Sequence, residues 1–271
     1  MVFAANPVFV GETIGYGKFV VPSRMVYPSR QREVPHFADW FRKRYYRVIE
    51  LDYGDDYLEG HGDLLWHPDG SRIYGGYGFR STRGGVEKFA ASMSEANTPV
   101  VPLQLIDPYC YHLDTCLCPL NNEAALIFPG AYSADALASL HKFWKRVHLL
   151  TAEEAHSFMG NGIVINGSYL TPYVAPPLEA ILHQEGLTPV IVETTEFEKA
   201  GGSQWIESKR AASGKIYVAF CCALSRHVGV FLIDDIEIVR WTEQNPGHTL
   251  MVAGQTERRQ AIGDGVSAGC R

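Results

Sequence analysis

Residues 113–150, LDTCLCPLNNEAALIFPGAYSADALASLHKFWKRVHLL, decide the fold class of this chain. Two mainly apolar segments, Leu113–Leu120 and Ala124–Phe128, are typical of strands, and so is Arg146–Leu150 at the end of the stretch. Before that last strand, Ala134–Lys145 repeats its apolar side chains at helical spacing. The stretch therefore predicts a unit in the order strand, strand, helix, strand.

The same order of elements recurs three more times along the chain. Identity between the copies is weak, so an ordinary α/β domain with alternating elements is the alternative to a true repeat. If the copies form a ring, their strand ends and loops gather around a central channel, where a substrate site is expected. The further expected strands are Val2–Val10, Lys18–Val21, Arg47–Leu51, Asp63–Trp66, Arg72–Tyr77, Pro99–Leu105, Gly162–Gly167, Ser168–Thr171 and Thr188–Glu193. The further expected helices are Val34–Tyr46, Val86–Met93 and Leu178–Glu185.

Composition excludes several classes of protein. A chain of 271 residues with 46% hydrophobic residues, 26 Gly and 15 Pro is neither collagen-like nor of low complexity. A net charge of -6 argues against non-specific binding of nucleic acid and against a polybasic membrane patch. The longest apolar runs, about ten residues, are shorter than the ~20 that span a bilayer. Without a basic leader and an A-x-A site, and with 6 Cys, the chain is expected in a reducing cytoplasm.

The first of three polar segments is Glu59-Gly-His-Gly-Asp63, which precedes an apolar strand. It places two carboxylates at an entry interrupted by glycines. Small residues let a ligand approach the backbone, so this pair suits the binding of a guanidinium or the handling of a proton. An ordinary acidic loop is the alternative.

The second polar segment is Cys110–Cys118, with the sequence CYHLDTCLC. Alternation along a strand would send His112, Asp114, Cys116 and Cys118 to one face. A His beside an Asp can act as an acid/base next to a ligand-binding carboxylate. A zinc-bound interaction module is one alternative, because Cys and His bind zinc, and a purely structural strand is another. Since no C-x-x-C occurs in the sequence, no metal is expected.

The third polar segment, residues 75–82, reads GGYGFRST. An Arg that closes a Gly-rich strand end offers a bidentate fork to a carboxylate, and Arg80 stands there. The spacing does not match G-x-G-x-x-G, so a nucleotide site is not favoured. A merely solvated Arg is the alternative.

Together these segments resemble the guanidine-modifying superfamily with the pentein fold. This superfamily includes arginine deiminases, amidinotransferases, dimethylarginine dimethylaminohydrolases and arginine dihydrolases. The matching stretches are Phe3-Ala-Ala-Asn6, Glu59-Gly-His-Gly-Asp63, Gly78-Phe-Arg-Ser-Thr82, His112-Leu-Asp-Thr115 and Lys199-Ala-Gly-Gly202. The amidinotransferase-like hydrolases of the arginine dihydrolase type are the most similar, because there an Asn follows the Phe-x-Ala opening. The resemblance implies an α/β-propeller of repeated ββαβ units, four recognisable here and a fifth incomplete.

The resemblance also implies a role for each matched residue. Glu59 matches the catalytic acid that orients the histidine and holds the guanidinium, and His112 matches the general acid/base. Asp114 matches the carboxylate that binds the guanidinium nitrogens, and Asn6 matches a polar contact to the same group.

For the carboxylate of the substrate, Arg80 matches the clamp and Arg24 is a weaker candidate. The implied substrate is a small guanidino compound, arginine or a methylated arginine, whose C–N bond is hydrolysed without metal or organic cofactor. The motifs do not separate deiminase, dihydrolase and amidinotransferase activities. They do not indicate an oligomeric state either.

One expected residue is missing from the pattern. In this family a thiolate attacks the guanidinium carbon, from a Cys a few residues after the Gly-Gly pair. Ile206 stands at that position and cannot act as a nucleophile, while Cys221 and Cys222 follow fifteen and sixteen positions later. The sequence therefore predicts an impaired hydrolase. The alternatives are a catalytically dead guanidino-binding or regulatory pseudoenzyme, and an active enzyme in which Cys221 or Cys222 reaches the site.

The resemblance ends near residue 205, which is the expected domain boundary. Residues 1–205 are expected to form a pentein domain shortened at its start. Residues 206–271 are expected to be a tail that is not the natural continuation of this domain, as after a splicing or gene-prediction error.

Overall fold

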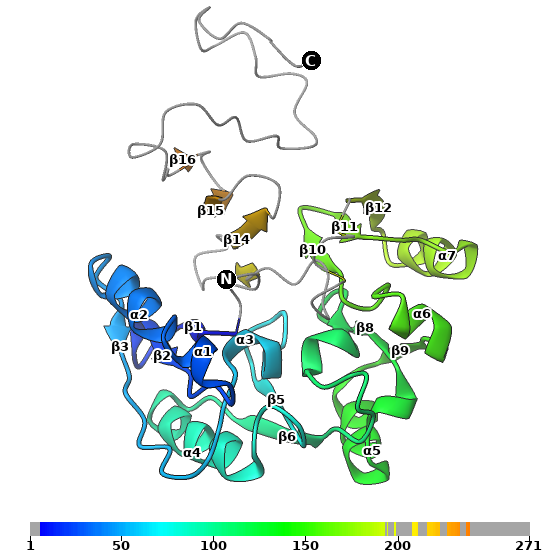
Figure 1. The fold of residues 1–271 in the computed structure, drawn as a ribbon. Coiled ribbons are helices and arrows are strands. Elements are labelled where there is room, and N and C mark those ends of the chain that lie inside the picture. The colour runs from blue at the N-terminus through cyan, green and yellow to red at the C-terminus, as the bar shows by residue number, and fades with distance from the viewer. Residues whose placement is uncertain are drawn as a thin grey trace, which may run out of the picture. The chain divides into compact units, whose positions relative to one another are not determined.

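The computed structural model describes residues 6–192, 194 and 198, together with the backbone of four later strands. Within residues 6–192 the chain builds four three-stranded sheets, one after another along the sequence (Figure 1). The expected mixed α/β class and the fourfold repeat of small sheets are both confirmed.

Each sheet belongs to a module of three strands and a helix. The first module has β1 (Val8–Thr13), β2 (Gly17–Pro22), α2 (Val34–Arg42) and β3 (Arg47–Val48). The second has β4 (Leu64–Trp66), β5 (Ile73–Tyr77), α4 (Arg83–Met93) and β6 (Val100–Gln104). The third has β7 (Leu117–Pro119), β8 (Ala124–Ile127), α5 (Ala134–Phe143) and β9 (Arg146–Leu149). The fourth has β10 (Ile163–Ile165), β11 (Ser168–Thr171), α7 (Pro176–Gln184) and β12 (Thr188–Ile191).

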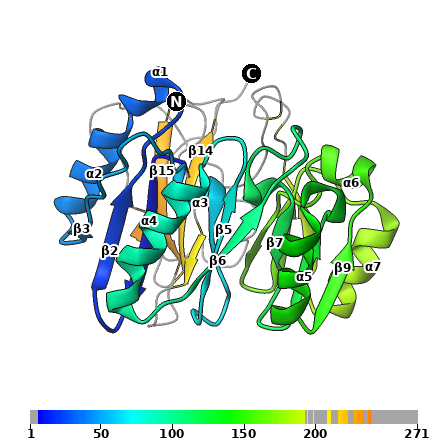
Figure 2. The ribbon, with the colours of Figure 1, turned by 90° about the horizontal axis from the view of Figure 1, so that it is seen from below.

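Every module has the same strand pairing. Its first two strands form an antiparallel hairpin, as in the register Phe9↔Val21 of the first module. The third strand then pairs parallel to the second, as in Phe19↔Arg47. Parallel pairing requires the chain to cross back along the sheet, and the helix makes that crossing. Figure 2 shows these helices beside their strands, with α4 and α5 towards the viewer.

Side-chain caps and apolar stripes explain why the helices form where they do. Thr82 accepts a hydrogen bond from the Gly85 amide at the start of α4, and Ser133 does the same for Ala136 in α5. The buried face of α4 includes Phe89, which is fully enclosed in a cluster with side chains of the first two sheets. The modules are therefore held together by apolar contacts between neighbouring sheets.

Short helices between these elements position the polar segments. They are α1 (Pro28–Gln31), α3 (Gly60–Asp63), η1 (Ser94–Ala96), η2 (Leu113–Thr115), η3 (Pro129–Ala131) and α6 (Ala152–His156). The helical turn α3 replaces the expected strand entry at the first polar segment. The turn η2 replaces the first three residues of the expected strand Leu113–Leu120. The Leu113 amide donates its hydrogen bond to Asp63 and is therefore not available for pairing with a neighbouring strand.

This turn makes the predicted alternation from His112 to Cys118 wrong. His112 precedes the turn, while Cys118 lies in β7 and its thiol donates to the Gly162 carbonyl at 3.1 Å. The four polar side chains therefore do not share one strand face. The first helix is also shorter than expected. Helix α2 ends at Arg42 instead of Tyr46, and Tyr45, beyond its end, is 96% exposed.

A further sheet has a different topology. Strands β13 (Ser208–Arg210), β14 (Ile216–Cys222), β15 (His227–Ile233) and β16 (Glu237–Ile238) pair in that order, each antiparallel to the next. Both Cys221 and Cys222 lie in β14. Ile206 and the expected boundary near residue 205 lie outside the described residues.

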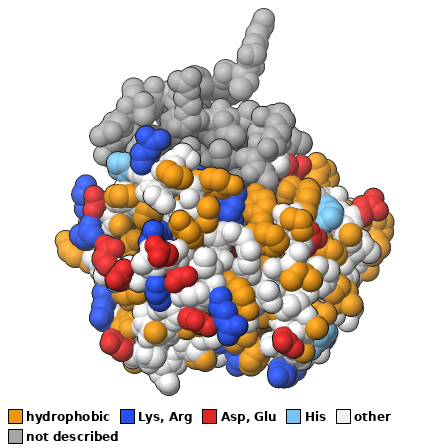
Figure 3. Space-filling view, turned by 60° about the horizontal axis from the view of Figure 1, so that its bottom comes forward, with side chains coloured by type: hydrophobic (Ala, Val, Ile, Leu, Met, Phe, Trp, Pro, Cys, Tyr) orange, Lys and Arg blue, Asp and Glu red, His pale blue; other side chains and the backbone are white. Residues whose placement is uncertain are grey.

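The surface shows no large region of one charge on the face drawn in Figure 3, where basic and acidic side chains are interspersed. That face therefore presents no continuous basic surface for nucleic acid. Among the helices of the described residues, none is both long and apolar enough to cross a membrane.

Candidate functional site

The polar segments predicted from sequence meet where α3 and η2 contact each other. Glu59 immediately precedes α3, His112 immediately precedes η2, and Asn6 lies just before β1, which also contacts α3. Three segments that are far apart in sequence thus present their polar side chains to one another.

A buried Glu–His pair forms the centre of the site. The Oε2 of Glu59 lies 2.9 Å from Nε2 of His112, and the two side chains are 0% and 9% exposed. An ionised carboxylate can only accept, so Nε2 donates to Glu59 when it carries a proton and can accept from Nδ2 of Asn6 when it does not. The side-chain amide of Asn6 lies 3.2 Å from the same nitrogen.

Further partners keep Glu59 ionised in spite of its burial. The Val26 amide donates to Oε1 at 3.0 Å, and Arg80 donates to Oε2 at 3.2 Å. Burial alone would raise the pKa of Glu59, but its hydrogen bond to His112, aided by Val26 and Arg80, lowers that pKa below its usual value. Glu59 is thus an ionised carboxylate in hydrogen-bond contact with His112.

Asp63 connects the segments beneath this pair. Its Oδ1 accepts from the Leu113 amide at 3.1 Å, and its Oδ2 accepts from the Ser81 hydroxyl at 2.6 Å and lies 4.0 Å from His112 Nε2. Ser81 also accepts from the Glu59 amide at 2.9 Å. Burial raises the pKa of Asp63 to about 6, although His112 and Ser81 oppose the shift. Sequence reasoning noted the second carboxylate of Glu59–Asp63 but did not include it in the site.

Asp114 is a second carboxyl group that is costly to ionise. It is 8% exposed, and its Oδ1 is buried with no hydrogen-bond partner among the described residues. Burial, followed by the charge of Asp63, raises the pKa of Asp114 well above its usual value, although Asn161 opposes the shift. Asn161 also donates to the Asp114 backbone carbonyl at 2.8 Å. The Asp114 carboxyl group is therefore fixed in place with an acceptor oxygen left unused.

Arg80 lies at the margin of the site and is 21% exposed. Its guanidinium carbon is 4.7 Å from the ring centroids of both Tyr27 and Tyr111. Flat aromatic rings limit the rotation of a guanidinium and add cation–π attraction, so the fork has a defined plane. The two tyrosines gave no signal in the sequence, since neither belongs to a matching motif.

Among the described residues, Arg24 makes no hydrogen bond or ion pair with the Glu59–His112 pair. Its guanidinium carbon lies 5.3 Å from the ring centroid of Tyr57, and its carbonyl accepts from the Leu58 amide at 3.0 Å. The Arg24 backbone thus holds Leu58, the residue before Glu59, while the Arg24 side chain packs on Tyr57.

Gly62 permits the close contact between the two sides of the site. A Cβ at this position would collide with Nδ2 of Asn6 and lie 3.2 Å from Cδ2 of His112. Any larger residue would therefore push the amide or the ring away from Glu59.

The alternative of a zinc module around residues 110–118 is not built as proposed. The thiol of Cys116 donates to the Leu113 carbonyl at 3.4 Å, and the thiol of Cys118 bonds to Gly162 instead of facing His112. Burial raises the pKa of Cys116 well above its usual value and that of Cys118 to about 12. These two thiols are structural. The thiol of Cys110 neighbours that of Cys116 and also lies close to Asp107 and His156, as described below.

Comparisons with known proteins agree with this geometry. No protein-family model matches the chain. The bifunctional arginine dihydrolase/ornithine cyclodeaminase ArgZ of Synechocystis sp. is 35% identical over 205 residues, which are 75% of this chain and 28% of that protein. The solved N-terminal domain of ArgZ bound to product matches with a TM-score of 0.68 at 35% identity, over 75% of this chain and 72% of that domain. The chain belongs to the pentein superfamily.

A second relative is a dimethylarginine dimethylaminohydrolase. The N(G),N(G)-dimethylarginine dimethylaminohydrolase of Mycobacterium tuberculosis is 32% identical over 203 residues, which are 75% of this pentein chain and 63% of that enzyme. This pentein chain therefore spans 28% of the length of ArgZ and just under two thirds of the second enzyme. The similarity to the two relatives is about equal, so it does not select one substrate.

Proposed function

We propose that this pentein chain binds arginine or a methylated arginine by its guanidino group, at a site of the type that hydrolyses guanidino C–N bonds. The observation that carries the proposal is the buried Oδ1 of Asp114, which has no hydrogen-bond partner among the described residues and lies in the same site as the Glu59–His112 pair. A buried acceptor without a donor is costly and is expected where a ligand supplies the donor.

The charge balance of the site favours a planar cation. The site holds three buried carboxyl groups, Glu59, Asp63 and Asp114. The arginine paired with one of them, Arg80, lies at the margin of the site. A guanidinium carries a delocalised charge and N–H donors in a plane, which match several carboxylate oxygens at once. The positive charge would lower the pKa of Asp114, so binding is expected to release a proton from that group.

The arrangement also supports the residue roles that the resemblance implies. Glu59, ionised and bonded to His112, is placed to orient the imidazole and hold a guanidinium nitrogen. His112 carries the proton that a leaving amine needs, and afterwards can accept one from water. Arg80, held between Tyr27 and Tyr111, is the clamp for the substrate carboxylate.

Solved relatives support the same class of substrate. The N-terminal domain of ArgZ, an arginine dihydrolase, has been crystallised bound to substrate and covalently bound to a reaction intermediate. AgrE has been crystallised with L-arginine. By analogy, we propose that the four modules correspond to four blades of the pentein propeller.

The nucleophile separates hydrolysis from binding alone. The family mechanism needs a thiolate, and sequence spacing places Ile206 at its position. This substitution favours a second candidate function, a guanidino-binding protein without catalysis. In the hydrolytic form, Cys221 or Cys222 of β14 would have to supply the thiolate.

Calorimetry of the purified chain tests the binding proposal. Arginine and asymmetric dimethylarginine are expected to bind, whereas lysine, a cation without a planar guanidinium, is expected to bind at least tenfold more weakly. Equal affinity for lysine and arginine, or no binding of either guanidino compound, would overturn the proposal.

A product assay then separates the two candidate functions. Release of ammonia, citrulline, ornithine or a methylamine that is lost in Cys221→Ala or Cys222→Ala supports hydrolysis. Binding without product release in the unmodified chain supports the binding protein.

A further inference from the structure

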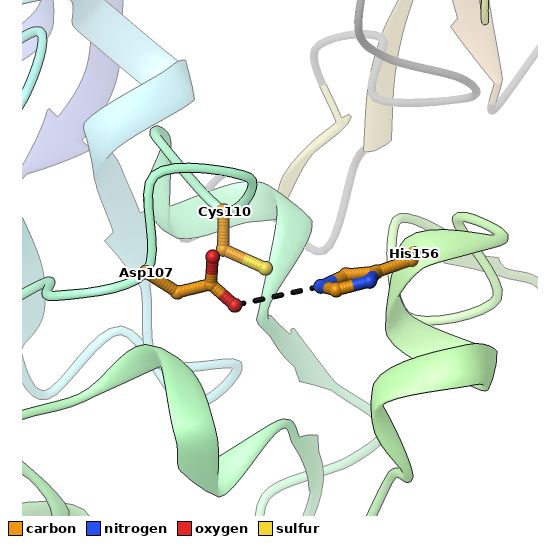
Figure 4. Close-up of side chains that lie close together, drawn as sticks. All are labelled: Asp107, Cys110 and His156. Carbon is orange, nitrogen blue, oxygen red and sulfur yellow. Dashed lines mark hydrogen bonds and ion pairs between the residues drawn. The ribbon is translucent and has the colours of Figure 1, made fainter.

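The segment between β6 and His112 carries a second polar group that the guanidino site does not use. Asp107 and Cys110 lie in this segment, and His156 is the last residue of α6. One ligand atom from each of the three side chains lies within 4.8 Å of the other two. Figure 4 shows the thiol, the carboxylate and the imidazole directed towards a common point. We infer that Asp107, Cys110 and His156 form a binding site for a divalent transition metal, best matched by Zn²⁺.

The donor types decide the class of ion. A thiol, an imidazole and a carboxylate are the three ligand types of protein zinc sites, whereas Mg²⁺ and Ca²⁺ select oxygen alone. Catalytic and other open zinc sites use three protein ligands with water in the fourth position. Cys110 is fully buried, while the side chains of Asp107 and His156 are 19% and 39% exposed. The ion would thus have a buried anchor and an open side.

The distances fit a metal better than a direct ion pair. Oδ2 of Asp107 lies 3.4 Å from Nε2 of His156. With zinc bonds of ~2.0–2.2 Å, the tetrahedral N···O edge is about 3.4 Å. The corresponding edge to sulfur is about 3.6 Å, so the thiol, which lies within 4.8 Å of the other two ligand atoms, needs to approach by at most about 1.2 Å.

Other histidine–carboxylate pairs of the described residues provide an internal comparison. The shortest N···O distances are 2.7 Å in His67–Asp69, 2.9 Å in His112–Glu59 and 2.8 Å in His148–Glu185. These are ordinary charge-assisted hydrogen bonds. The His156–Asp107 pair is held about half an ångström further apart, at a separation that a bridging ion suits.

Tyr109 holds two of the three ligands in position. Its backbone amide donates to Oδ1 of Asp107 at 2.8 Å, which leaves Oδ2 for the site. Its hydroxyl donates to the His156 carbonyl at 2.8 Å, and its ring lies 4.1 Å from the imidazole, centroid to centroid. Outer contacts of this kind orient metal ligands and contribute to metal affinity.

The site would join the segment that carries His112 to the connection between the third and fourth modules. On binding, the Cys110 thiol loses its proton to the buffer and its sulfur bonds to the ion. Because the folded state alone assembles the three ligands, Zn²⁺ is expected to raise the melting temperature of the chain. This effect does not require the guanidino site to be active.

The test uses the full chain, stripped of metal by a chelator under reducing conditions. Zn²⁺ is titrated against a chromophoric chelator, and Co²⁺ serves as a probe whose thiolate charge-transfer absorption reports a bond to sulfur. We expect Cys110→Ser and His156→Asn each to lose one equivalent of bound Zn²⁺, or at least ~100-fold in affinity, since even outer-shell partners are worth 10- to 100-fold. The matched controls Cys118→Ser and His36→Asn, outside the cluster, are expected to retain it.

The variant Asp107→Asn tests whether a loss of Zn²⁺ binding could result from misfolding. Asn keeps the oxygen that accepts from the Tyr109 amide, so the loop is preserved while one anionic ligand is lost. We expect a cooperative melt that Zn²⁺ no longer shifts. If Cys110→Ser and His156→Asn bind Zn²⁺ as the unmodified chain does, or if the unmodified chain binds none, the inference is wrong.

Discussion

Two buried Glu–His pairs in this chain have nearly the same geometry but different surroundings. Glu59 of the first polar segment and His112 of the second meet at 2.9 Å. Glu185 and His148 meet at 2.8 Å, where the end of α7 contacts β9. The Glu side chains of the two pairs are 0% and 2% exposed.

The neighbours of each pair differ in charge. Glu185 also accepts two hydrogen bonds from Arg146, both at 2.9 Å, and one from Asn121 at 2.8 Å. Its hydrogen bonds to Arg146 above all lower the pKa of Glu185 to about 2. The negative charge of Glu185 is thus balanced by Arg146.

Glu59 accepts one hydrogen bond from Arg80, but its site also holds two further carboxyl groups, Asp63 and Asp114, both with raised pKa values. The contrast shows that a buried Glu–His pair does not by itself indicate a functional site. The indication is a set of carboxyl groups with raised pKa values beside the pair, together with an acceptor such as Oδ1 of Asp114 that has no donor among the described residues.

The largest expected effect is a loss of arginine affinity at the Glu59–His112 site that a substitution at the Glu185–His148 pair does not cause. Asp114→Asn should weaken arginine binding about 100-fold, or about 2.7 kcal/mol, because it removes the charge that pairs with the guanidinium. Stability should be nearly unchanged, since the amide resembles the protonated carboxyl. Calorimetric titration measures the affinity, and Glu185→Gln is the matched control. Equal losses of affinity in both variants would show that the comparison is wrong.

The second-largest expected effect is on protein stability and not on arginine binding. Glu185→Gln should lower the free energy of unfolding by about 2 kcal/mol, because Arg146 and His148 lose a buried anionic partner. A pKa depressed to about 2 means that this contribution is present above the usual pKa near 4.5 and is lost as pH falls through about 2. Urea unfolding at neutral pH and near pH 2 measures it. An unfolding free energy unchanged by the substitution at neutral pH would contradict a structural role.

Asp63 should give the opposite dependence on pH. With a folded-state pKa raised to about 6, its favourable contribution is present below about 4 and is lost as pH rises through about 6. Stability from this group should fall by about 1 kcal/mol per pH unit across that range. Asp63→Asn should reduce this slope, which a series of urea melts from pH 4 to 7 would reveal, while Asp114, whose pKa is also raised, should leave a residual slope of the same sign. A slope unchanged in the variant would assign the titration to another group.

The smallest expected effect concerns the two arginine candidates for the substrate carboxylate. Arg80→Ala should weaken arginine binding about tenfold, because a partly exposed guanidinium–carboxylate pair is lost. Arg24→Ala should change it less than threefold, since its side chain lies against Tyr57. Parallel titrations of the two variants measure the difference. A larger loss for Arg24→Ala would exchange their roles.

The sequence predicted the parts that depend on local pattern. Alternating apolar segments and amphipathic helices predicted the four modules, and motif order predicted that Glu59, His112 and Asn6 belong together. Asp63 could not be chosen from pattern alone, because its importance comes from hydrogen bonds to Ser81 and Leu113, 18 and 50 residues away in the sequence.

The same limit explains the wrong strand face at residues 112–118. Alternation assumes an extended backbone, but a long-range hydrogen bond from Leu113 to Asp63 forms the turn η2 and rotates the following side chains. The Asp107–Cys110–His156 cluster was likewise hidden, since 46 residues separate Cys110 from His156 in the sequence.

The amino-acid sequence by itself determined the repeated strand–strand–helix–strand order and the identity of the groups available for chemistry. Propensity, periodicity and capping act over a few residues, and these are local properties. Tertiary structure alone decided which carboxylates are compensated and which are not. The reason is that a pKa and an unpaired acceptor depend on burial and on partners from distant segments, as the raised pKa of Asp114 and the lowered pKa of Glu185 show.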